Sequence, residues 1–429
     1  MQIAIMTMFG KLDSTYSLVN VVAEQLRMLL DAGLSVRLLV CEGFEHQSKF
    51  GIFLDPRIDW HEVCNTLDGR QIEWQNYDQP DPQVHATFFD EAKVIAADLA
   101  AHLADVQVCI LHDILYQGWH LLHNVALRAT QEKLPDLRFI SFSHSAPLRR
   151  PPNPQWPGSA RFTPMPRTTF ISLTYAGIAP LAAQYDLPEG RCRVVYNSLD
   201  LLSSLGEDAA RLAAQADLLS PQVLIVYPGR LTPAKHFEKL ASLAGAIKSA
   251  GETSVRAVFC DFPSGDINPN LYKGVVRLAG KEAGLSDEDM IFTSEQGFPG
   301  GFPRSGVLDL FTLSNLFVHP SFSEAFPLIA LEAASRGNLL VVNQAVPSLE
   351  EVGRQLGAHF MRWDALAYGY QTTESYLPSE KEYYLEHAET ILGLLRENPV
   401  LAAKTLVRRR YSPAWVWKHQ LGPLVTGPD

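Results

Sequence analysis

The feature that most constrains the fold is a regular alternation of short apolar runs with longer helical patterns. Residues 2–8 have the pattern of a buried strand, residues 16–33 that of an amphipathic helix ending near Gly33, and residues 35–41 that of the next strand. A strand, a helix and a second strand form a βαβ unit, which is typical of a parallel sheet covered by helices on both faces. The sequence therefore predicts an α/β fold that begins with a doubly wound parallel sheet.

The same alternation continues through the first half of the chain and starts again after residue 221. In the first half we expect strands at 106–111, 138–142, 169–173 and 193–196 and a helix at 117–131. In the second half we expect strands at 223–227, 255–260, 290–293, 315–319 and 339–343, separated by helices at 236–250, 272–284, 306–314 and 327–336. We therefore predict an N-terminal domain (1–200), a C-terminal domain (201–400) and terminal helices (401–429).

Two segments of the first half lack a clear period. Residues 44–85 are irregular, and residues 146–168 contain seven prolines. Segments of this kind are either plain surface loops or loops that bind a ligand above a rigid scaffold, and the sequence favours neither interpretation.

Composition excludes several classes of protein. The chain has 429 residues, 47% of them hydrophobic, which is ordinary for two or three globular domains. Its net charge of −11 argues against general binding to nucleic acid or to anionic membranes, and leaves room for a local basic pocket. No apolar run reaches the ~18 residues of a membrane span, and the start does not resemble a signal peptide. Five widely spaced cysteines favour reduced thiols and a cytoplasmic location.

The most informative stretch is residues 315–353. A buried strand is followed by a serine-rich turn with Glu324, then by a helix that contains Glu332 and ends near Gly337. Pro327 suits the first helical position, because its missing N–H costs nothing there. We expect the backbone N–H groups at this helix entrance, from Ala325 through Phe326 to Leu328, to point at an anion. Alone, the two glutamates could equally be solvated surface carboxylates.

A second motif joins a strand to the next helix. Gly229 and Arg230 follow an apolar strand, and Lys235 lies at the start of the helix. A planar guanidinium and a point-charge ammonium on one loop suit a diphosphate.

Histidines form a third group. His112 with Asp113 and His144 follow two expected strands, so the sheet should bring them to the same edge. His120 and His123 are three residues apart on a helix, but no third ligand lies at a useful spacing. We interpret this second pair as surface histidines and expect no metal site. The chain also lacks G-x-G-x-x-G, the P-loop motif and G-x-S-x-G, which weighs against nicotinamide, P-loop and α/β-hydrolase enzymes.

Taken together, these motifs resemble those of a retaining glycosyltransferase with two Rossmann-like domains facing a cleft (the GT-B architecture), family 4, also called glycosyltransferase group 1. The resemblance covers most of the chain and is strongest over 190–353. It rests on PSFSEAFPLIALEAASRG (320–337), YPGRLTPAKH (227–236), VVYNSLD (194–200), LHD (111–113), FSH (142–144) and YSPAWVWKHQL (411–421). Ala325 and Pro327 depart from it, because the family has glycine at these positions.

The resemblance implies a role for each candidate residue. Glu324 would lie beside the donor sugar with His144 near the reacting carbon, and Glu332 would bind the ribose. Arg230 and Lys235 would neutralise the diphosphate, with Gly229 and the backbone of residues 325–328 beside it. Gly10, Lys11, His112 and Asp113 would lie on the acceptor side. The terminal helices would pack on the N-terminal domain.

The resemblance also implies the chemistry. A sugar would move from a nucleotide-diphosphate sugar, most commonly a UDP-sugar, to an acceptor that the sequence does not identify, with retention and without an obligatory metal or cofactor. The alternatives are a solute receptor, against which the missing secretion signal argues, and a glycosyltransferase-like subunit that binds the nucleotide sugar without turnover. Hydrolysis of donor sugars would distinguish an enzyme from such a subunit.

Overall fold

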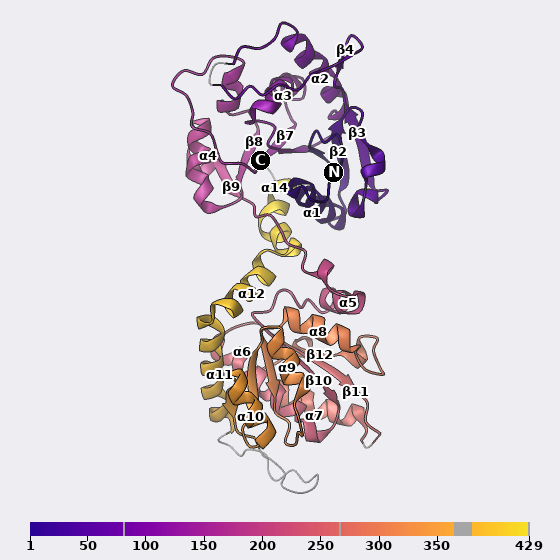
Figure 1. The fold of residues 1–429 in the computed structure, drawn as a ribbon, viewed down its shortest axis with the longest axis vertical. Coiled ribbons are helices and arrows are strands. Elements are labelled where there is room, and N and C mark those ends of the chain that lie inside the picture. The colour runs from indigo at the N-terminus through magenta and orange to yellow at the C-terminus, as the bar shows by residue number, and fades with distance from the viewer. Residues whose placement is uncertain (80–81, 266, 364–379, 428–429) are drawn as a thin grey trace. The chain divides into compact units, whose positions relative to one another are not determined.

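The computed structural model describes residues 1–79, 82–265, 267–363 and 380–427 (Figure 1). The chain divides into two compact units: Met1–Leu199 with Pro413–Asp429, and Asp200–Ser412. The division differs from the expected one near the C-terminus. Residues 401–412 belong to the second unit, and the C-terminal part of the first unit begins only at Pro413. No helix among the described residues is long and apolar enough to cross a membrane.

The first unit contains a seven-stranded parallel sheet in the order β3-β2-β1-β6-β7-β8-β9. Its strands are β1 (Gln2–Met6), β2 (Ser35–Cys41), β3 (Ile58–Val63), β6 (Val108–His112), β7 (Arg138–Ser143), β8 (Thr168–Ser172) and β9 (Cys192–Val194). The two faces carry separate hydrophobic clusters. The helices of this unit are α1 (Ser17–Asp31), α2 (Phe88–His102), α3 (Leu121–Lys133), α4 (Ile178–Tyr185), α13 (Pro413–Val416) and α14 (Gly422–Thr426).

The end of the chain packs on the same face of this sheet as α1. Val416, Leu421 and Val425 are fully buried in that cluster. Arg138 of β7 donates to the carbonyls of Val425 and Gly427, at 2.9 and 3.0 Å. The last helices are therefore part of the first unit's core.

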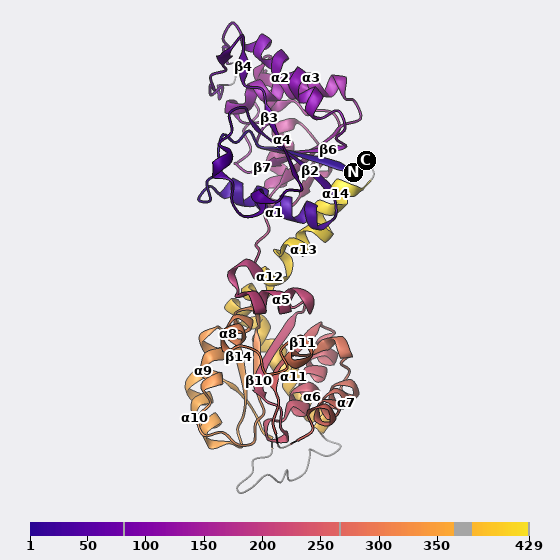
Figure 2. The same cartoon turned by 90° about the vertical axis from the view of Figure 1, so that its right-hand side faces the viewer.

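The described residues of the second unit form a six-stranded parallel sheet in the order β12-β11-β10-β13-β14-β15. Figure 2 shows this sheet between α8, α9 and α10 on one face and α6, α7 and α11 on the other. The strands are β10 (Val223–Arg230), β11 (Val255–Phe262), β12 (Met290–Phe292), β13 (Leu316–His319), β14 (Leu339–Asn343) and β15 (His359–Met361). The helices are α5 (Glu207–Gln215), α6 (Phe237–Gly251), α7 (Pro269–Glu282), α8 (Arg304–Leu313), α9 (Leu328–Ser335), α10 (Pro347–Leu356), α11 (Glu380–Glu397) and α12 (Pro399–Arg410).

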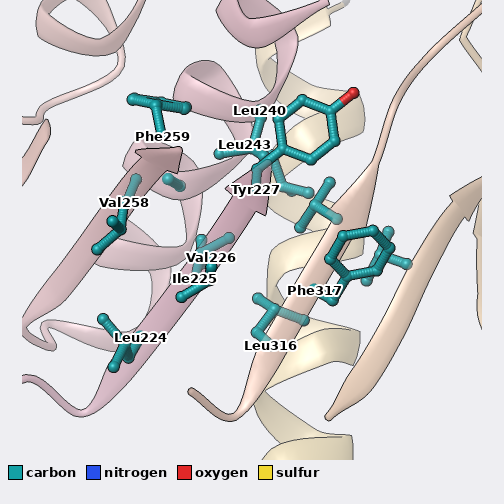
Figure 3. Packing of buried hydrophobic residues seen from close by; sticks show 14 of the residues in the cluster. Leu224, Ile225, Val226, Tyr227, Leu240, Leu243, Val258, Phe259, Leu316 and Phe317 are labelled. Carbon is teal, nitrogen blue, oxygen red and sulfur yellow. The ribbon is translucent and has the colours of Figure 1, made fainter. Parts of the chain in front are cut away.

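Strand β10 runs through the middle of the second unit's core (Figure 3). Leu224, Ile225 and Val226 are completely buried, although consecutive residues of a strand point to opposite faces. Both faces are therefore covered, and each such side chain contributes about 1.5–3 kcal/mol by leaving water. This burial explains why the sequence has a continuous apolar run at this point rather than an alternating one.

The predicted α/β fold with two doubly wound parallel sheets is confirmed, and the differences in detail have simple causes. The irregular segment 44–85 contains the edge strand β3, which pairs in parallel with β2. Its residues Asp59, His61 and Glu62 are partly exposed, so the strand lacks the continuous apolar run by which the buried strands were predicted. Strand β10 extends three residues past the expected end, pairing with β11 as far as Arg230 and Phe262. Helix α2 also went unpredicted.

Candidate active site

Each sheet has one point at which its strand order reverses. In the first unit this point lies between β1 and β6, and in the second between β10 and β13. Open α/β sheets bind ligands outside the carboxyl ends of the strands at such a point. The sequence-predicted residues fall at these two places, which we describe in turn.

In the second unit, the loops after β10 and β13 are joined by hydrogen bonds. The carbonyl of Ala234 accepts from the backbone N–H of Phe322 at 3.4 Å and from the hydroxyl of Ser321 at 3.3 Å. Ser321 is completely buried, and its own carbonyl accepts from the Asn343 amide at the end of β14. The three loops that follow β10, β13 and β14 therefore hold one another in place.

This junction brings Lys235 and Glu324 together, 89 residues apart in the chain. The Lys235 ammonium donates to Glu324 Oε2 at 2.8 Å, and both side chains are about three-quarters buried. The imidazole of His319, 3.6 Å from the same oxygen, and then the ammonium of Lys235 lower the pKa of Glu324 to about 2, although desolvation opposes them. Glu324 is therefore an ionised carboxylate at neutral pH.

A third loop fixes the backbone of Glu324. The hydroxyl of Ser348, in the first turn of α10, donates to the Glu324 carbonyl at 2.5 Å. The carboxylate is thus held by its backbone from one side and by Lys235 from the other. Such fixed polar groups can stabilise charge without first reorganising.

Arg230 and Gly229 lie at the end of β10 rather than in the loop after it. The Arg230 side chain is exposed, and in the described part of the chain it forms no ion pair. A Cβ placed on Gly229 would make only ordinary contacts, of which the nearest is with Phe237 at 3.5 Å. Arg230 is therefore a cation available for a ligand, whereas Lys235 already has a carboxylate partner.

The backbone of the α9 entrance departs from the prediction. Helix α9 begins at Leu328, and Pro327 precedes it as the capping residue instead of occupying the first turn. The Leu328 N–H donates to the Phe326 carbonyl at 3.0 Å, and proline has no N–H, so two of the four expected positions offer no donor. The N–H groups of Ala325 and Phe326 donate to no residue that the structure describes. Of the four backbone positions at which we expected an anion-binding N–H group, only Ala325 and Phe326 therefore keep one that is available.

Glu332 lies inside α9 and is paired. Its Oε1 accepts from Arg304 Nε at 2.9 Å and also from Arg304 Nη2, at the start of α8. The Glu332 side chain is largely buried, while that of Arg304 is 78% exposed. The carboxylate is thus oriented by a neighbouring helix rather than freely solvated.

In the first unit, the sheet brings His112 and His144 together as expected. His112 Nδ1 and His144 Nε2 lie 2.8 Å apart, and His112 Nε2 lies 3.0 Å from the Gln25 side-chain oxygen. His112 is 1% exposed, so it contacts no ligand and instead orients His144. Burial, and then the neighbouring His144, lower the pKa of His112, and burial lowers that of His144, so both are neutral at pH 7.

Asp113 fixes the loop that carries His144. Its Oδ1 accepts from the backbone N–H of His144 at 2.7 Å and from the Tyr116 hydroxyl at 2.9 Å, and Oδ2 accepts from Gln117 at 2.9 Å. It is 7% exposed. Gly10 and Lys11 lie exposed in the loop after β1, where the Gly10 carbonyl accepts from the N–H of Glu45.

The prediction that His120 and His123 are surface residues is wrong for His123, whereas His120 is only partly buried. His123 is 2% exposed, packs its ring 4.9 Å from that of Trp74, and neither of its nitrogens has a partner among the described residues. Burial lowers the pKa of His120 to about 4 and, with the added effect of His120, that of His123 to about 3. The irregular segment that contains Trp74 covers them, which helix periodicity alone does not reveal. Within the described ranges, no group of three or more His, Cys, Asp or Glu could hold a metal.

Sequence reasoning missed three residues of these sites: Gln25, His319 and Ser348. Gln25 is a polar residue on the buried stripe of α1, and this was a readable signal. His319 ends β13 directly before the serine-rich turn and has the same position as His112 on β6. Ser348 gives no local signal, because only the fold places it below Glu324.

The fold and these edges define a protein with two Rossmann-like domains, one of which carries a fixed carboxylate and two cations at its switch point. Residues 211–360, which lie within the second unit, match the family model described as glycosyl transferases group 1. A stretch of 165 residues is 27% identical to D-inositol 3-phosphate glycosyltransferase of Corynebacterium glutamicum (strain R), and it spans 38% of this chain and 37% of that protein. These two matches support a glycosyltransferase of group 1.

Solved structures of similar topology include a glycosyltransferase from Rickettsia africae ESF-5, with 13% identity and a TM-score of 0.37 over 100% of this chain and 99% of that one. Another is Anabaena HepE in complex with UDP and glucose, with 12% identity and a TM-score of 0.35 over 99% of each chain.

Proposed function

We propose that this protein is a retaining glycosyltransferase of family 4 that transfers a hexosyl group from a UDP-sugar to an acceptor. The observation that carries the proposal is the Lys235–Glu324 ion pair at the switch point inside the matched region, with Arg230 at the end of the preceding strand β10 and without an ion-pair partner among the described residues. Nothing on this edge identifies the acceptor, which could be a carbohydrate, a lipid, a small molecule or a protein.

Arg230 and Lys235 neutralise the diphosphate leaving group in this proposal. Negative charge develops on the bridging oxygen as the bond from the sugar to the diphosphate breaks, and fixed donors stabilise it most strongly in the transition state. The N–H groups of Ala325 and Phe326 add two neutral donors next to the Lys235–Glu324 pair. Two protein cations supply the charge that a bound metal supplies elsewhere, so the proposed reaction needs no obligatory metal.

The two glutamates hold the rest of the donor. Glu324, ionised and already bonded to Lys235, accepts from a hydroxyl of the donor sugar. Glu332 accepts from the ribose hydroxyls with the carboxylate oxygen that Arg304 leaves free. Glu324 therefore affects turnover, and Glu332 mainly affects nucleotide affinity.

On the acceptor side, the neutral His144 offers a hydrogen bond to a sugar or acceptor hydroxyl, while His112 and Asp113 keep it in place. Gly10 and Lys11 border the same edge of the first sheet. A cytoplasmic location is part of the proposal, and it is supported by five cysteines that are all free thiols in the structure.

The test is to replace Glu324 by Gln and to measure donor hydrolysis and UDP binding on the same preparation. We expect hydrolysis to be lost while UDP affinity stays close to that of wild type, because the amide keeps the shape and loses the charge. Glu350→Gln is the matched control, since Glu350 is a surface carboxylate of α10 paired with Arg354. Near-normal hydrolysis in Glu324→Gln would remove Glu324 from the catalytic residues. UDP binding without hydrolysis in wild type would indicate a binding subunit.

A further inference from the structure

The second unit has a basic cavity at the opposite edge of its sheet from the donor residues. The cavity has a volume of about 500 Å³ and is bordered by the amino ends of β10 and β13, the end of α6, and helices α11 and α12. Figures 1 and 2 show α12 at the same end of the second unit as α5, which precedes β10. Because β10 has eight residues, the two edges are roughly 23 Å apart at ~3.3 Å per residue.

Three arginines line this cavity: Arg396 of α11, and Arg409 and Arg410 of α12. In the part of the chain that the structure describes, none of them forms an ion pair with a carboxylate. Arg396 Nε donates to the Leu392 carbonyl at 3.2 Å, and Arg409 Nε donates to the Ser220 carbonyl at 2.9 Å. Arg409 Nη1 also donates to the side-chain oxygen of Gln222. These acceptors are neutral, so they orient Arg396 and Arg409 without compensating their charge.

A fourth arginine lies in the same turn. Arg408 is 1% exposed, and its Nη1 donates to the carbonyls of Leu218 and Leu219, while Nε and Nη2 have no partner among the described residues. Burial, and then the nearby Arg409, lower the pKa of Arg408, although Asp217 opposes the shift. Burial, and then Arg410, lower that of Arg409. These cations repel one another in a chain of net charge −11.

The ordinary explanation for arginines at a helix end does not account for this cluster. A helix C-terminus carries about −0.5 of an elementary charge. The ends of α11 and α12 together supply about −1, whereas three guanidinium groups line the cavity, not counting Arg408. The remaining positive charge faces a cavity large enough for a small organic ligand.

The rest of the lining suits a phosphate ester. Asn315, which is 2% exposed, donates to the Thr405 hydroxyl at 2.8 Å, and these two polar residues form part of the cavity lining. Leu392, Leu395 and Leu406 form an apolar side. Guanidinium groups bind phosphate oxygens by paired, charge-assisted hydrogen bonds. We propose that this cavity binds a phosphate-bearing anion at a site separate from the donor edge, where the ligand anchors or regulates the protein rather than reacts.

The phosphate could belong to a free small molecule or to a lipid headgroup. Leu406 of α12, which lines the cavity with the arginines, is 45% exposed, and this would suit contact with lipid chains. Both sources present the same chemistry to Arg396, Arg409 and Arg410, so the test must separate them.

The first arm is a calorimetric titration of inorganic pyrophosphate into the full chain in the presence of saturating UDP, so that the proposed diphosphate site at Arg230 and Lys235 is already occupied. We expect saturable binding that is at least about tenfold weaker in Arg396→Gln/Arg410→Gln, since two charge-assisted contacts are lost. Arg409→Gln is a second variant in case the double variant folds poorly, and Arg354→Gln, on α10, is the matched control. The variants should leave UDP affinity unchanged, whereas Arg230→Gln should weaken UDP and retain the pyrophosphate site. Failure of this proposal is thereby separated from failure of the proposed function.

The second arm is sedimentation with vesicles of phosphatidylglycerol in phosphatidylcholine, with pure phosphatidylcholine as the control. Vesicle binding that the arginine variants lose, without pyrophosphate binding, assigns the site to a lipid headgroup. Pyrophosphate binding that the arginine variants lose, without vesicle binding by wild type, assigns the site to a free phosphate. If wild type binds both pyrophosphate and vesicles and the variants lose both, the site accepts a phosphate from either source. Absence of both kinds of binding in wild type, or equal binding in wild type and variants, overturns the proposal.

Discussion

The carboxyl edges of the two sheets both have a histidine at a strand end, but the histidine's partner is neutral in the first sheet and charged in the second. In the first unit, a histidine at the end of β6 is bonded to a second histidine, and burial keeps both neutral. In the second unit, a histidine at the end of β13 lies beside Glu324, which stays ionised with Lys235 as its partner. Each edge has a strand-end histidine, but only the second holds a lysine ammonium in an ion pair beside it.

This difference indicates what each edge can bind. At the first edge, the neutral His144 can exchange hydrogen bonds with hydroxyl groups and attracts no anion strongly, and the buried His112 and Asp113 hold it in place. The second edge carries Arg230 and Lys235, cations of the kind that bind a diphosphate, as the proposed function requires. The comparison therefore supports the proposal that the nucleotide binds to the second unit, and four experiments test it.

The largest expected effect is that of Lys235→Met. Loss of the ammonium should lower kcat for donor hydrolysis by about 10²–10³-fold, the usual cost of removing one preorganised donor to developing charge. Lys239→Met is a matched control, since its ammonium also contacts a carboxylate at 2.8 Å, that of Glu380 on α11. Steady-state kinetics at saturating UDP-sugar measures both variants. If they lose kcat equally, the fixed charge of this edge has no special role in turnover.

The next effect is that of Glu332→Ala on nucleotide affinity. A hydrogen bond to a charged group is worth about 1.5–3 kcal/mol, so UDP should bind roughly ten- to a hundred-fold more weakly. Calorimetry with UDP and its 2′,3′-dideoxy analogue measures the preference for ribose. Wild type should prefer UDP, and the variant should lose most of that preference. Equal preference in both proteins would contradict the assignment of Glu332 to the ribose.

The third effect is the pH dependence of stability and compares the two units directly. His123 has a pKa near 3 when folded and near 6.5 when unfolded, so the unfolded chain binds more protons as the pH falls below 6.5. The free energy of unfolding should then fall by up to about 1.4 kcal/mol per pH unit from this group. Glu324, with its pKa lowered from 4.5 to about 2, contributes stability that is lost only below pH 4.5.

Urea denaturation between about pH 7 and pH 5 tests whether His123, rather than Glu324, makes the free energy of unfolding depend on pH in this range. His123→Phe should reduce the pH dependence in this window, whereas Glu324→Gln should not. His46→Phe is the control, because the His46 side chain is 53% exposed. An unchanged slope in His123→Phe would show that His123 acquires a partner or solvent in solution.

The smallest effect is expected from Ala325→Gly, which introduces the residue found at this position in the family that the sequence resembles. Ala325 is exposed, and its N–H is one of the two amides that remain for the diphosphate. Because glycine adds about 0.5–1 kcal/mol of backbone freedom, UDP affinity should change by less than about fivefold. A much larger gain in affinity would show that the Cβ of Ala325 obstructs the phosphate.

Much of the fold could be read from the sequence, since buried parallel strands are continuous apolar runs. This is why the β10 region and the stretch from β13 to β14 were placed nearly correctly. The edge strand β3 was missed because its exposed residues break that pattern. His123 was misjudged because a helix period does not show which distant segment covers a face. Pro327 was misplaced by one position, because a cap depends on the path of the preceding loop.

The sequence alone determined the two parallel sheets, the strand ends near His112 and His144, and the helix entrance near Glu324, but it placed Arg230 after a strand that in fact extends to it. These features depend on local periodicity and on the identity of residues next to buried strands. Only the tertiary structure decided which charges pair: Lys235 with Glu324, and Glu332 with Arg304. It also decided that three arginines of α11 and α12 share one cavity without a carboxylate. Pairing depends on distances between groups far apart in the chain, and these distances exist only once the strands are in register.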